Sequence, residues 1–149
     1  MKARILLSVL TLLCLFFCAA ASGQEWDALL EEAKSMGASG KYDSAVVLGE
    51  LALKEALAEF GETDTSVARV LSRLGRYYGC LGEHFSAETL LVKALDIRIG
   101  AHGVEHSEVA HSMALLADAY NLQGRHAESE RLFRRALAMM EKVLDPDDL

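Results

Sequence analysis

Three stretches of the chain repeat one pattern and decide the fold: GKYDSAVVLGELAL at residues 40–53, GEHFSAETLLVKAL at residues 82–95 and GRHAESERLFRRAL at residues 124–137. Each stretch begins with a glycine, ends with Ala-Leu and starts 42 residues after the previous one. Apolar and small side chains recur every three or four residues within them, which is helical spacing. A repeat of this length predicts a stack of helix pairs, because a single pair cannot bury its apolar face alone.

Residues outside these stretches repeat at the same distance, so the repeat unit extends through most of the chain. We expect units at about 24–61, 64–101 and 106–143, within one domain of residues 24–149. No strand pattern appears, and the fold class predicted is all-α: an α-solenoid of three antiparallel helix pairs. The further matched pairs are Gly61 with Gly103, Val67 with Val109, Ala68 with Ala110, Leu74 with Leu116, and Tyr78 with Tyr120.

Breakers and capping residues divide the chain into six expected helices. Glycines end helices because they adopt a positive φ readily. Asp64 or Thr65, and Ser107 in the next unit, can accept hydrogen bonds from the free N–H groups of a helix start. The first unit departs most from the other two: it has Glu32, Met36 and Gly49 where they have leucine, tyrosine and a large apolar residue, so we expect its packing to be the loosest. The expected helices are roughly 25–36, 42–60, 66–80, 84–99, 107–122 and 127–143.

The first 23 residues differ in kind from the rest. Lys2 and Arg4 precede an apolar run at residues 5–21, and small residues follow at residues 19–23. This order is typical of a secretory signal peptide, with cleavage after residue 21, 22 or 23. It predicts an exported protein, periplasmic or secreted. A retained membrane anchor is the alternative, although a run of 17 residues, broken by Ser8 and Thr11, is at the short limit for a bilayer span of roughly 30 Å.

The three cysteines and the net charge narrow the classes of partner. Cys14 or Cys18 as a lipidation site is a further alternative, but both follow large residues. If both leave with the signal, Cys80 has no internal disulfide partner, and we expect it to be a small packed residue. The formal charge is −7, and it becomes −9 without Lys2 and Arg4. An acidic chain is a poor ligand for nucleic acid or for anionic membrane surfaces.

The repeated residues resemble a known family. The second unit carries Leu74, Gly75, Tyr78, Gly82, Ala87, Ala94 and Leu95, and the third carries Leu116, Ala117, Tyr120, Gly124, Ser129, Ala136 and Leu137. This pattern resembles the tetratricopeptide repeat, in the 42-residue form that is similar to kinesin light chains, over about residues 25–149. The resemblance implies a right-handed superhelix whose first helices line a concave surface that holds an extended peptide. It implies a non-catalytic, protein-binding module without a cofactor.

Candidate binding residues follow from charge spacing and from the family template. Arg69, Arg73 and Arg76 share one helix face, which concentrates positive charge in an acidic chain. An exposed face paired with nearby acids is the alternative reading. Arginine can bind a carboxylate through two hydrogen bonds, so an acidic segment or a free C-terminus fits as the partner. On the family template the groove residues are Arg69, Ser72, Arg76, His111, Ala114, Asp118 and Asn121.

Motifs for catalysis or metal binding are weak. Gly37 to Lys41 lacks the spacing of a phosphate-binding loop, and no Gly-x-Ser-x-Gly occurs. His106 and His111 are five residues apart, whereas a His-Glu-x-x-His zinc helix needs four. His102, His106 and His111 meeting at a loop is the remaining metal hypothesis. We therefore expect no enzyme, no metal and no cofactor.

The end of the sequence suggests a second functional class. Residues 145–149 align with a loop that precedes a further pair, so the last helix has no polar cap. An uncapped repeat end predicts association, either with another copy or with a partner, unless the sequence is a fragment of a longer array. The alternative function is thus a structural module that self-associates through its last helix, without a groove ligand. The residues expected to be exposed there are Leu132, Phe133, Met139 and Met140.

Overall fold

The computed structural model describes residues 25–144, and the expected signal peptide at residues 1–23 lies outside them. This described part contains six helices and no strand, which confirms the all-α prediction. The first helix spans residues 25–38. The others are α2 (Tyr42–Phe60), α3 (Thr65–Cys80), α4 (His84–His102), α5 (Ser107–Leu122) and α6 (His126–Leu144).

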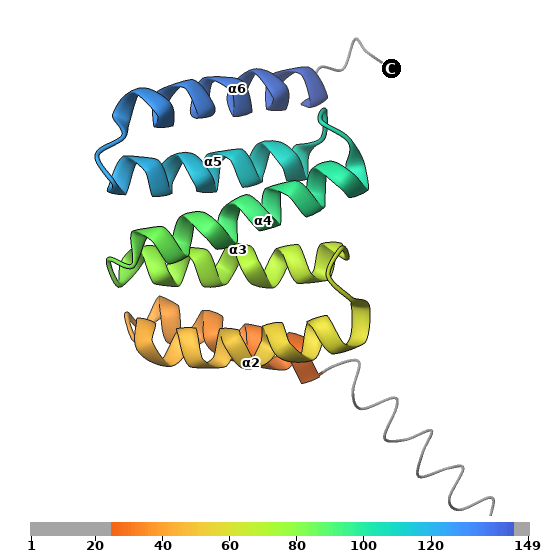
Figure 1. Ribbon diagram of the computed structural model, residues 1–149, viewed down its shortest axis with the longest axis vertical. Coiled ribbons are helices and arrows are strands. Elements are labelled where there is room, and N and C mark those ends of the chain that lie inside the picture. Colours follow the sequence, from red (N-terminus) through yellow and green to blue (C-terminus); the bar gives the residue numbers. More distant parts are fainter. Residues whose placement is uncertain (1–24, 145–149) are drawn as a thin grey trace, which may run out of the picture.

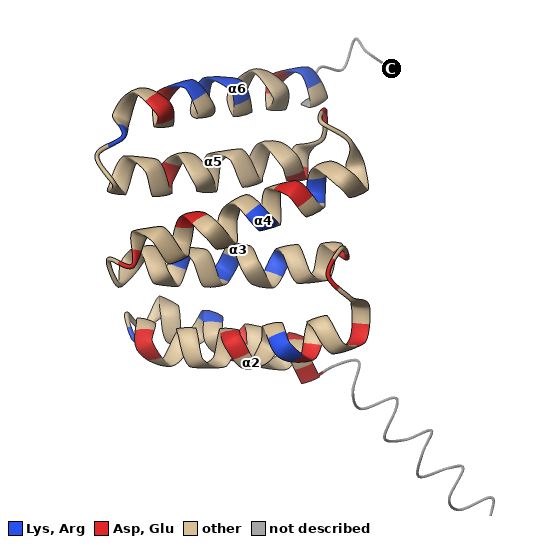
Figure 2. Ribbon diagram, in the orientation of Figure 1, with Lys and Arg blue, Asp and Glu red and all other residues tan. Residues whose placement is uncertain are grey.

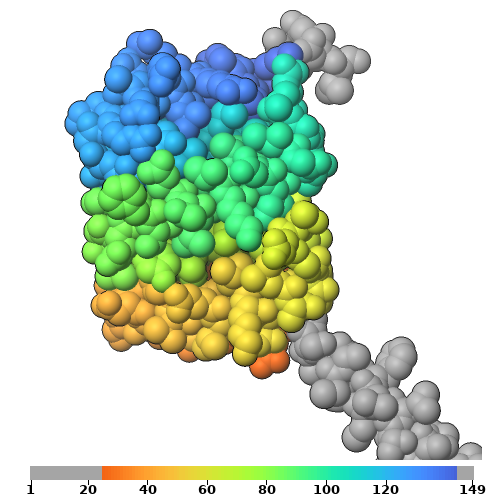
Figure 3. All heavy atoms as spheres, in the orientation of Figure 1, coloured from red at the N-terminus to blue at the C-terminus, as the bar shows by residue number. Residues whose placement is uncertain are grey.

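The helices stack in chain order, and each runs antiparallel to the next (Figure 1). Their side chains fill the space between successive helices, so the stack forms one continuous body (Figure 3). Among α2 to α6, the backbones of α3 and α5 come close to each other across the intervening α4, whereas those of α2, α4 and α6 stay farther apart. The layer that contains α3 and α5 is therefore the more closely spaced one, as the inner side of a curved stack must be.

Glycines with positive φ end the helices at the repeated positions. Gly40, Gly82 and Gly124 have φ of 74°, 83° and 76° and form the turn inside each pair. Residues with a Cβ rarely adopt this conformation, which explains why the repeat keeps glycine there. Helix α4 extends to His102, beyond the expected end near residue 99, because Gly103 (φ 80°) is where its backbone leaves the helical region.

Side chains cap the two helices of the inner layer that follow a long loop. Asp64 accepts a hydrogen bond from the Ser66 N–H at 2.7 Å, which agrees with the expected cap of α3. The expectation of Ser107 at the start of α5 is wrong by one residue. The cap is His106, whose Nδ1 accepts from the Glu108 N–H at 3.1 Å, and Ser107 is already helical.

Small residues allow neighbouring helices to approach closely, both within a pair and between pairs. Gly49 is buried, and a Cβ added to it would lie 2.3 Å from the Leu74 Cδ1. The Leu74 side chain of the neighbouring helix therefore fills the space that Gly49 leaves. The repeated alanines are likewise buried, and these are Ala45, Ala52, Ala87, Ala94 and Ala136.

Helix α6 forms the last layer, and its exposure differs from the expectation in detail. Leu132, Met139 and Met140 are half-buried against α5, since they pack on the cluster that contains Val109 and Met113. Phe133 is exposed as expected, and the other large apolar side chains that α6 exposes are Leu137 and Val143. Among the helices of residues 25–144, none combines the length and apolar character that a membrane-spanning helix requires.

A hydrogen bond between α2 and α3 gives the fold a pH dependence at alkaline pH. The Tyr78 hydroxyl donates to Glu50 Oε1 at 2.6 Å. This bond, together with burial and the Glu50 charge, raises the pKa of Tyr78 from 10.0 to about 12. The folded phenol holds its proton more tightly than the unfolded one. Its contribution to stability is therefore complete below pH 10 and is lost as the pH rises through about 12.

We expect wild-type protein to lose more stability between about pH 9 and pH 12 than Tyr78→Phe does, because only the wild type has this hydrogen bond to lose. Urea unfolding at a series of pH values measures both proteins, and the difference between their losses reports the Tyr78–Glu50 hydrogen bond. Identical losses in the two proteins would show that the Tyr78–Glu50 contact contributes nothing.

Candidate functional site

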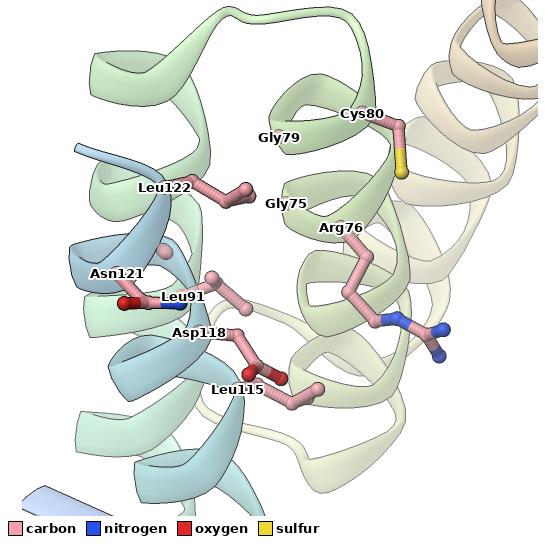
Figure 4. A pocket seen from close by; sticks show the side chains of 10 residues that line it. Gly75, Arg76, Gly79, Cys80, Leu91, Leu115, Asp118, Asn121 and Leu122 are labelled. Carbon is pink, nitrogen blue, oxygen red and sulfur yellow. The ribbon is translucent and has the colours of Figure 1, made fainter. Parts of the chain in front are cut away.

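A cleft of about 270 Å³ opens between α3 and α5 on the inner layer of the stack (Figure 4). Its floor is apolar and includes the α4 residue Leu91 together with Gly75, Gly79, Leu115, Ala119 and Leu122. Its rim is polar and consists of Arg76, Cys80, Asp118 and Asn121.

Two glycines of α3 give the cleft its depth. A Cβ on Gly75 would lie 2.8 Å from Leu91 Cγ and 3.2 Å from the carbonyl oxygen of Ala87. A Cβ on Gly79 would lie 3.6 Å from Leu122 Cδ1. The missing side chains let α4 approach α3 and leave a recess above Leu91. The local sequence therefore produces both the close packing and the hollow beside it.

The rim side chains are available to a ligand. Figure 4 shows that the Asp118 side chain of α5 is directed towards α3. The Arg76 guanidinium extends from α3 in the direction away from α5. Within residues 25–144, neither side chain makes a hydrogen bond or ion pair. The Asn121 Oδ1 lies 2.8 Å from His126 Nδ1, so the N–H groups of the Asn121 amide are left to bind a ligand. Cys80, expected to be packed, is exposed, because it is the last residue of α3 and lies at the cleft edge.

The other two arginines of α3 are already paired. Arg69 forms an ion pair with Asp27, and its guanidinium lies 4.7 Å from the centre of the Trp26 ring. Arg73 lies 4.0 Å from Glu31. Figure 2 shows the basic residues of α3 above acidic residues of the first two helices. The alternative reading, an exposed face paired with nearby acids, thus describes Arg69 and Arg73 but not Arg76.

A second hollow of about 360 Å³ lies at the other end of α3. Its two arginines are neutralised locally, since Arg69 pairs with Asp27 and Arg98 pairs with Glu108 at 3.3 Å. This hollow offers less free charge to a ligand than the rim of the first cleft does. Its lining residues are Trp26, Thr65, Ser66, Arg69, Arg98, His102 and Glu108.

Arg98 of α4 forms a buried polar cluster that joins the two inner helices. Only 5% of the residue is exposed, and its Nη1 donates to the hydroxyls of Ser72 on α3 and Ser112 on α5. Burial lowers the pKa of Arg98, and the charge of Glu108 opposes this shift. Ser72 is therefore a structural residue inside the stack, and its expected place on the groove surface is wrong.

The three histidines of the metal hypothesis are not arranged as metal ligands. The rings of His102 and His106 stack with their centres 4.2 Å apart and their planes 11° from parallel, so their nitrogens do not converge. His111 is exposed on α5. In the part of the chain that the structure describes, no group of three or more His, Cys, Asp or Glu side chains could hold a metal ion.

The structure thus brings together three of the predicted site residues: Arg76, Asp118 and Asn121. It places Arg69 in the second hollow and Ser72 in the buried cluster. The apolar floor was missed, although Gly75 and Gly79, four residues apart on one helix, are a sequence signal for close approach. Arg98 was missed too, although the other two repeats have Ala56 and Met140 at its position.

Comparison with known proteins supports the same architecture. The chain resembles the structure of BtubC (BKLC) from P. vanneervenii with a TM-score of 0.76 and 22% identity, over 86% of this chain and 50% of that one. It resembles the TPR domain of Arabidopsis FLU with a TM-score of 0.70 and 17% identity, over 81% of this chain and 98% of that one.

A third similar structure contains the TPR-like repeats of a kinesin-light-chain-like protein from Podosopora anserina, with a TM-score of 0.69 and 24% identity. The match covers 80% of this chain and 56% of that one. The chain therefore spans about half the length of two of these three proteins. No curated protein matches it significantly by sequence.

The family model of the tetratricopeptide repeat matches residues 66–142, which is more than half of the chain. These residues cover nearly all of α3 to α6 and include both sides of the cleft. Tetratricopeptide repeats are modules of protein–protein interaction. The chain therefore belongs to the tetratricopeptide repeat family.

Proposed function

We propose that the protein is a non-catalytic scaffold that holds a peptide segment of a partner in the cleft between α3 and α5. The observation that carries this proposal is the cleft itself, which has a volume of about 270 Å³ and an apolar floor, and whose rim includes Arg76 and Asp118. Apolar recesses with a few polar groups at the rim are the usual form of a binding site. The long 42-residue repeat supports a kinesin-light-chain-like subfamily.

The chemistry of the rim defines the segment that fits. Arg76 can bind a carboxylate through two hydrogen bonds, from an acidic side chain or from a free C-terminus. Asp118 accepts hydrogen bonds, and the Asn121 amide can donate them, so the two can bind the peptide backbone of the ligand. The floor has room for an apolar side chain beside that carboxylate. The proposed ligand is thus a peptide with one apolar residue next to an acidic group.

The test is a fluorescence anisotropy titration with peptides that end in a leucine carboxylate. We expect Arg76→Glu to weaken binding by at least about tenfold, which is 1.4 kcal/mol, because it replaces an attractive charge with a repulsive one. Arg73→Glu is the matched control: the same change one turn away, at a residue already near Glu31 and outside the cleft lining. It should change the affinity by less than about twofold.

A peptide with an amidated C-terminus separates the two sources of the carboxylate. If amidation abolishes binding, Arg76 binds the carboxylate of the free C-terminus. If the amidated peptide still binds, Arg76 binds the carboxylate of an acidic side chain. The proposal fails if Arg76→Glu and Arg73→Glu weaken binding equally, or if no peptide of either kind binds.

The proposal also places the protein outside the cytoplasm, in a periplasm or in the secreted fraction. It rests on the order of charge, apolar run and small residues in residues 1–23. Sequencing the N-terminus of protein recovered from a host that exports it should give a mature chain that starts at residue 22, 23 or 24. A chain that retains Met1 in the membrane fraction would instead support the anchor.

A further inference from the structure

The third pair shows how this stack covers the groove of the pair before it. Helix α5 packs on α4, where Leu91 and Leu95 join a cluster with Leu115, Leu116 and Ala119. Leu122 of α5 lies 3.6 Å from the Cβ position of Gly79. The covered groove is thus formed by Gly79, Ala87, Leu91 and Leu95. The side chains that cover it from α5 include Leu115, Ala119 and Leu122.

The residues 42 positions later form the same groove on α6, and nothing within residues 25–144 covers it. They are Asn121, Ser129, Phe133 and Leu137, and they line a hollow of about 540 Å³. Leu91 is 2% exposed, whereas its equivalent Phe133 is 39% exposed and Leu137 is 60% exposed. The last pair therefore keeps the surface that receives a helix of the α5 kind.

The opposite end of the stack is built differently. Four apolar residues of α3 are buried against the preceding pair: Val67, Val70, Leu74 and Tyr77. The equivalent residues of the first helix are all exposed, and they are Glu25, Ala28, Glu32 and Ser35. This end is polar and offers no apolar ridge. A second copy cannot extend the array by placing its first helix on α6 without burying two glutamates against Phe133 and Leu137, which is costly.

Charge argues against two copies packing α6 on α6. Arg134 lines the hollow, with its side chain 77% exposed, and Arg131 and Arg135 are exposed on the same helix. Arg134 pairs with Glu130 at 2.6 Å and Glu128 pairs with Arg125, so the positive charge left over on the described part of α6 is that of Arg131 and Arg135. A two-fold contact would bring two such arginine-rich faces together, whereas an acidic helix would be attracted to this one.

We propose that α6 is a second interaction surface, which receives an acidic amphipathic helix from a partner protein. The helix presents a leucine, a small residue and a second leucine at positions i, i+4 and i+7, as Leu115, Ala119 and Leu122 do in α5. Its ridge fills the hollow along Phe133 and Leu137, and its acidic residues are attracted to the exposed arginines of α6. This surface lies on the next pair of helices and shares Asn121 with the rim of the cleft between α3 and α5.

A peptide of residues 107–122, acetylated and amidated, is the probe, because it contains the ridge in an acidic sequence with Glu108 and Asp118. Labelled with fluorescein, it is titrated with the full chain. We expect saturable binding, weakened at least about tenfold by Phe133→Ser combined with Leu137→Ser. Val47→Ser is the matched control, since Val47 is 58% exposed on α2 at the other end of the stack.

Two further variants test the chemistry of the contact. Arg134→Glu should weaken the binding of the peptide and remove the dependence of its affinity on salt concentration. Arg76→Glu should leave this affinity unchanged. A peptide with serine in place of Leu115 and Leu122 should not bind. Circular dichroism checks that each protein variant keeps its helix content.

Three results would overturn the proposal. The first is no binding of the peptide, and the second is binding that the α6 substitutions leave unchanged. The third is a dimer of the wild-type protein, measured by light scattering, that the Phe133→Ser and Leu137→Ser substitutions dissociate. In that case a second copy of the chain, not a partner helix, occupies the α6 surface.

Discussion

Replacing Arg98 with alanine is expected to lower the free energy of unfolding by about 2–4 kcal/mol, because it leaves a cavity and removes two buried hydrogen bonds. The guanidinium joins α4 to Ser72 on α3 and to Ser112 on α5, so its loss loosens both inner helices at one point. Removing the cost of burying the charge offsets part of this effect. Urea unfolding followed by circular dichroism measures the difference.

Methionine at the same position separates packing from charge. Met140 occupies the equivalent position in the third repeat, so the fold accepts this side chain. The free energy of unfolding of Arg98→Met should lie within about 1 kcal/mol of the wild-type value, or exceed it. The reason is that an apolar residue of similar volume often replaces a buried charge without loss of stability. If both variants lose the same large amount, the charge and its hydrogen bonds, and not packing, hold the helices together.

Replacing Leu91 with alanine is expected to destabilise the protein by about 3 kcal/mol, within the range for a buried leucine. Leu91 is 2% exposed, packs between α3 and α5, and forms the floor of the cleft. The substitution also enlarges the cleft, so peptides with a larger apolar residue should gain affinity relative to those with a smaller one. Thermal unfolding and the anisotropy titration measure the two effects.

The repeat supplies the control for this substitution. Phe133 is the equivalent residue one repeat later and is 39% exposed, so Phe133→Ala should cost only about 1 kcal/mol, although it removes more atoms. The contrast tests whether the groove on α6 is open in solution. Equal losses at the two positions would mean that Phe133 is covered in the free protein.

The helix pairs can be predicted well from the sequence, because each repeat contains the same turn glycines and the same spacing of apolar residues. Glycine at residues 40, 82 and 124 marks a turn with positive φ, and Asp64 marks a capped helix start. Helix ends are harder to place, because a helix can continue past its last apolar residue until a residue such as glycine adopts a positive φ. Helix α4 runs on to His102 although the apolar pattern fades near residue 99.

Contacts between helices were harder to predict than the helices themselves. Arg69 pairs with Asp27, and Arg73 lies near Glu31, in each case across the 42-residue repeat. The repeat register contained this information, since equivalent residues of adjacent units lie side by side. The role of Gly49 was not accessible in this way, because the residue that fills its space, Leu74, comes from a different position of the next unit.

The candidate site was predictable in its polar residues and not in its shape. The family template placed Arg76, Asp118 and Asn121 on one surface, and the cleft contains all three. Ser72 is also on α3, but the Arg98 side chain reaches it from α4 and buries it. A hollow arises from what side chains leave unfilled, which depends on three helices at once. Sequence spacing on one helix cannot show it.

The most direct test of peptide capture is an NMR titration of the ¹⁵N-labelled full chain with the tightest-binding peptide. The account predicts that amide shifts concentrate at the cleft, at Arg76, Asp118, Asn121 and Leu122, while α2 and the outer face of α6 stay unchanged. Shifts centred on the second hollow around Arg69, or on Phe133 and Leu137, with none at Arg76, would contradict it.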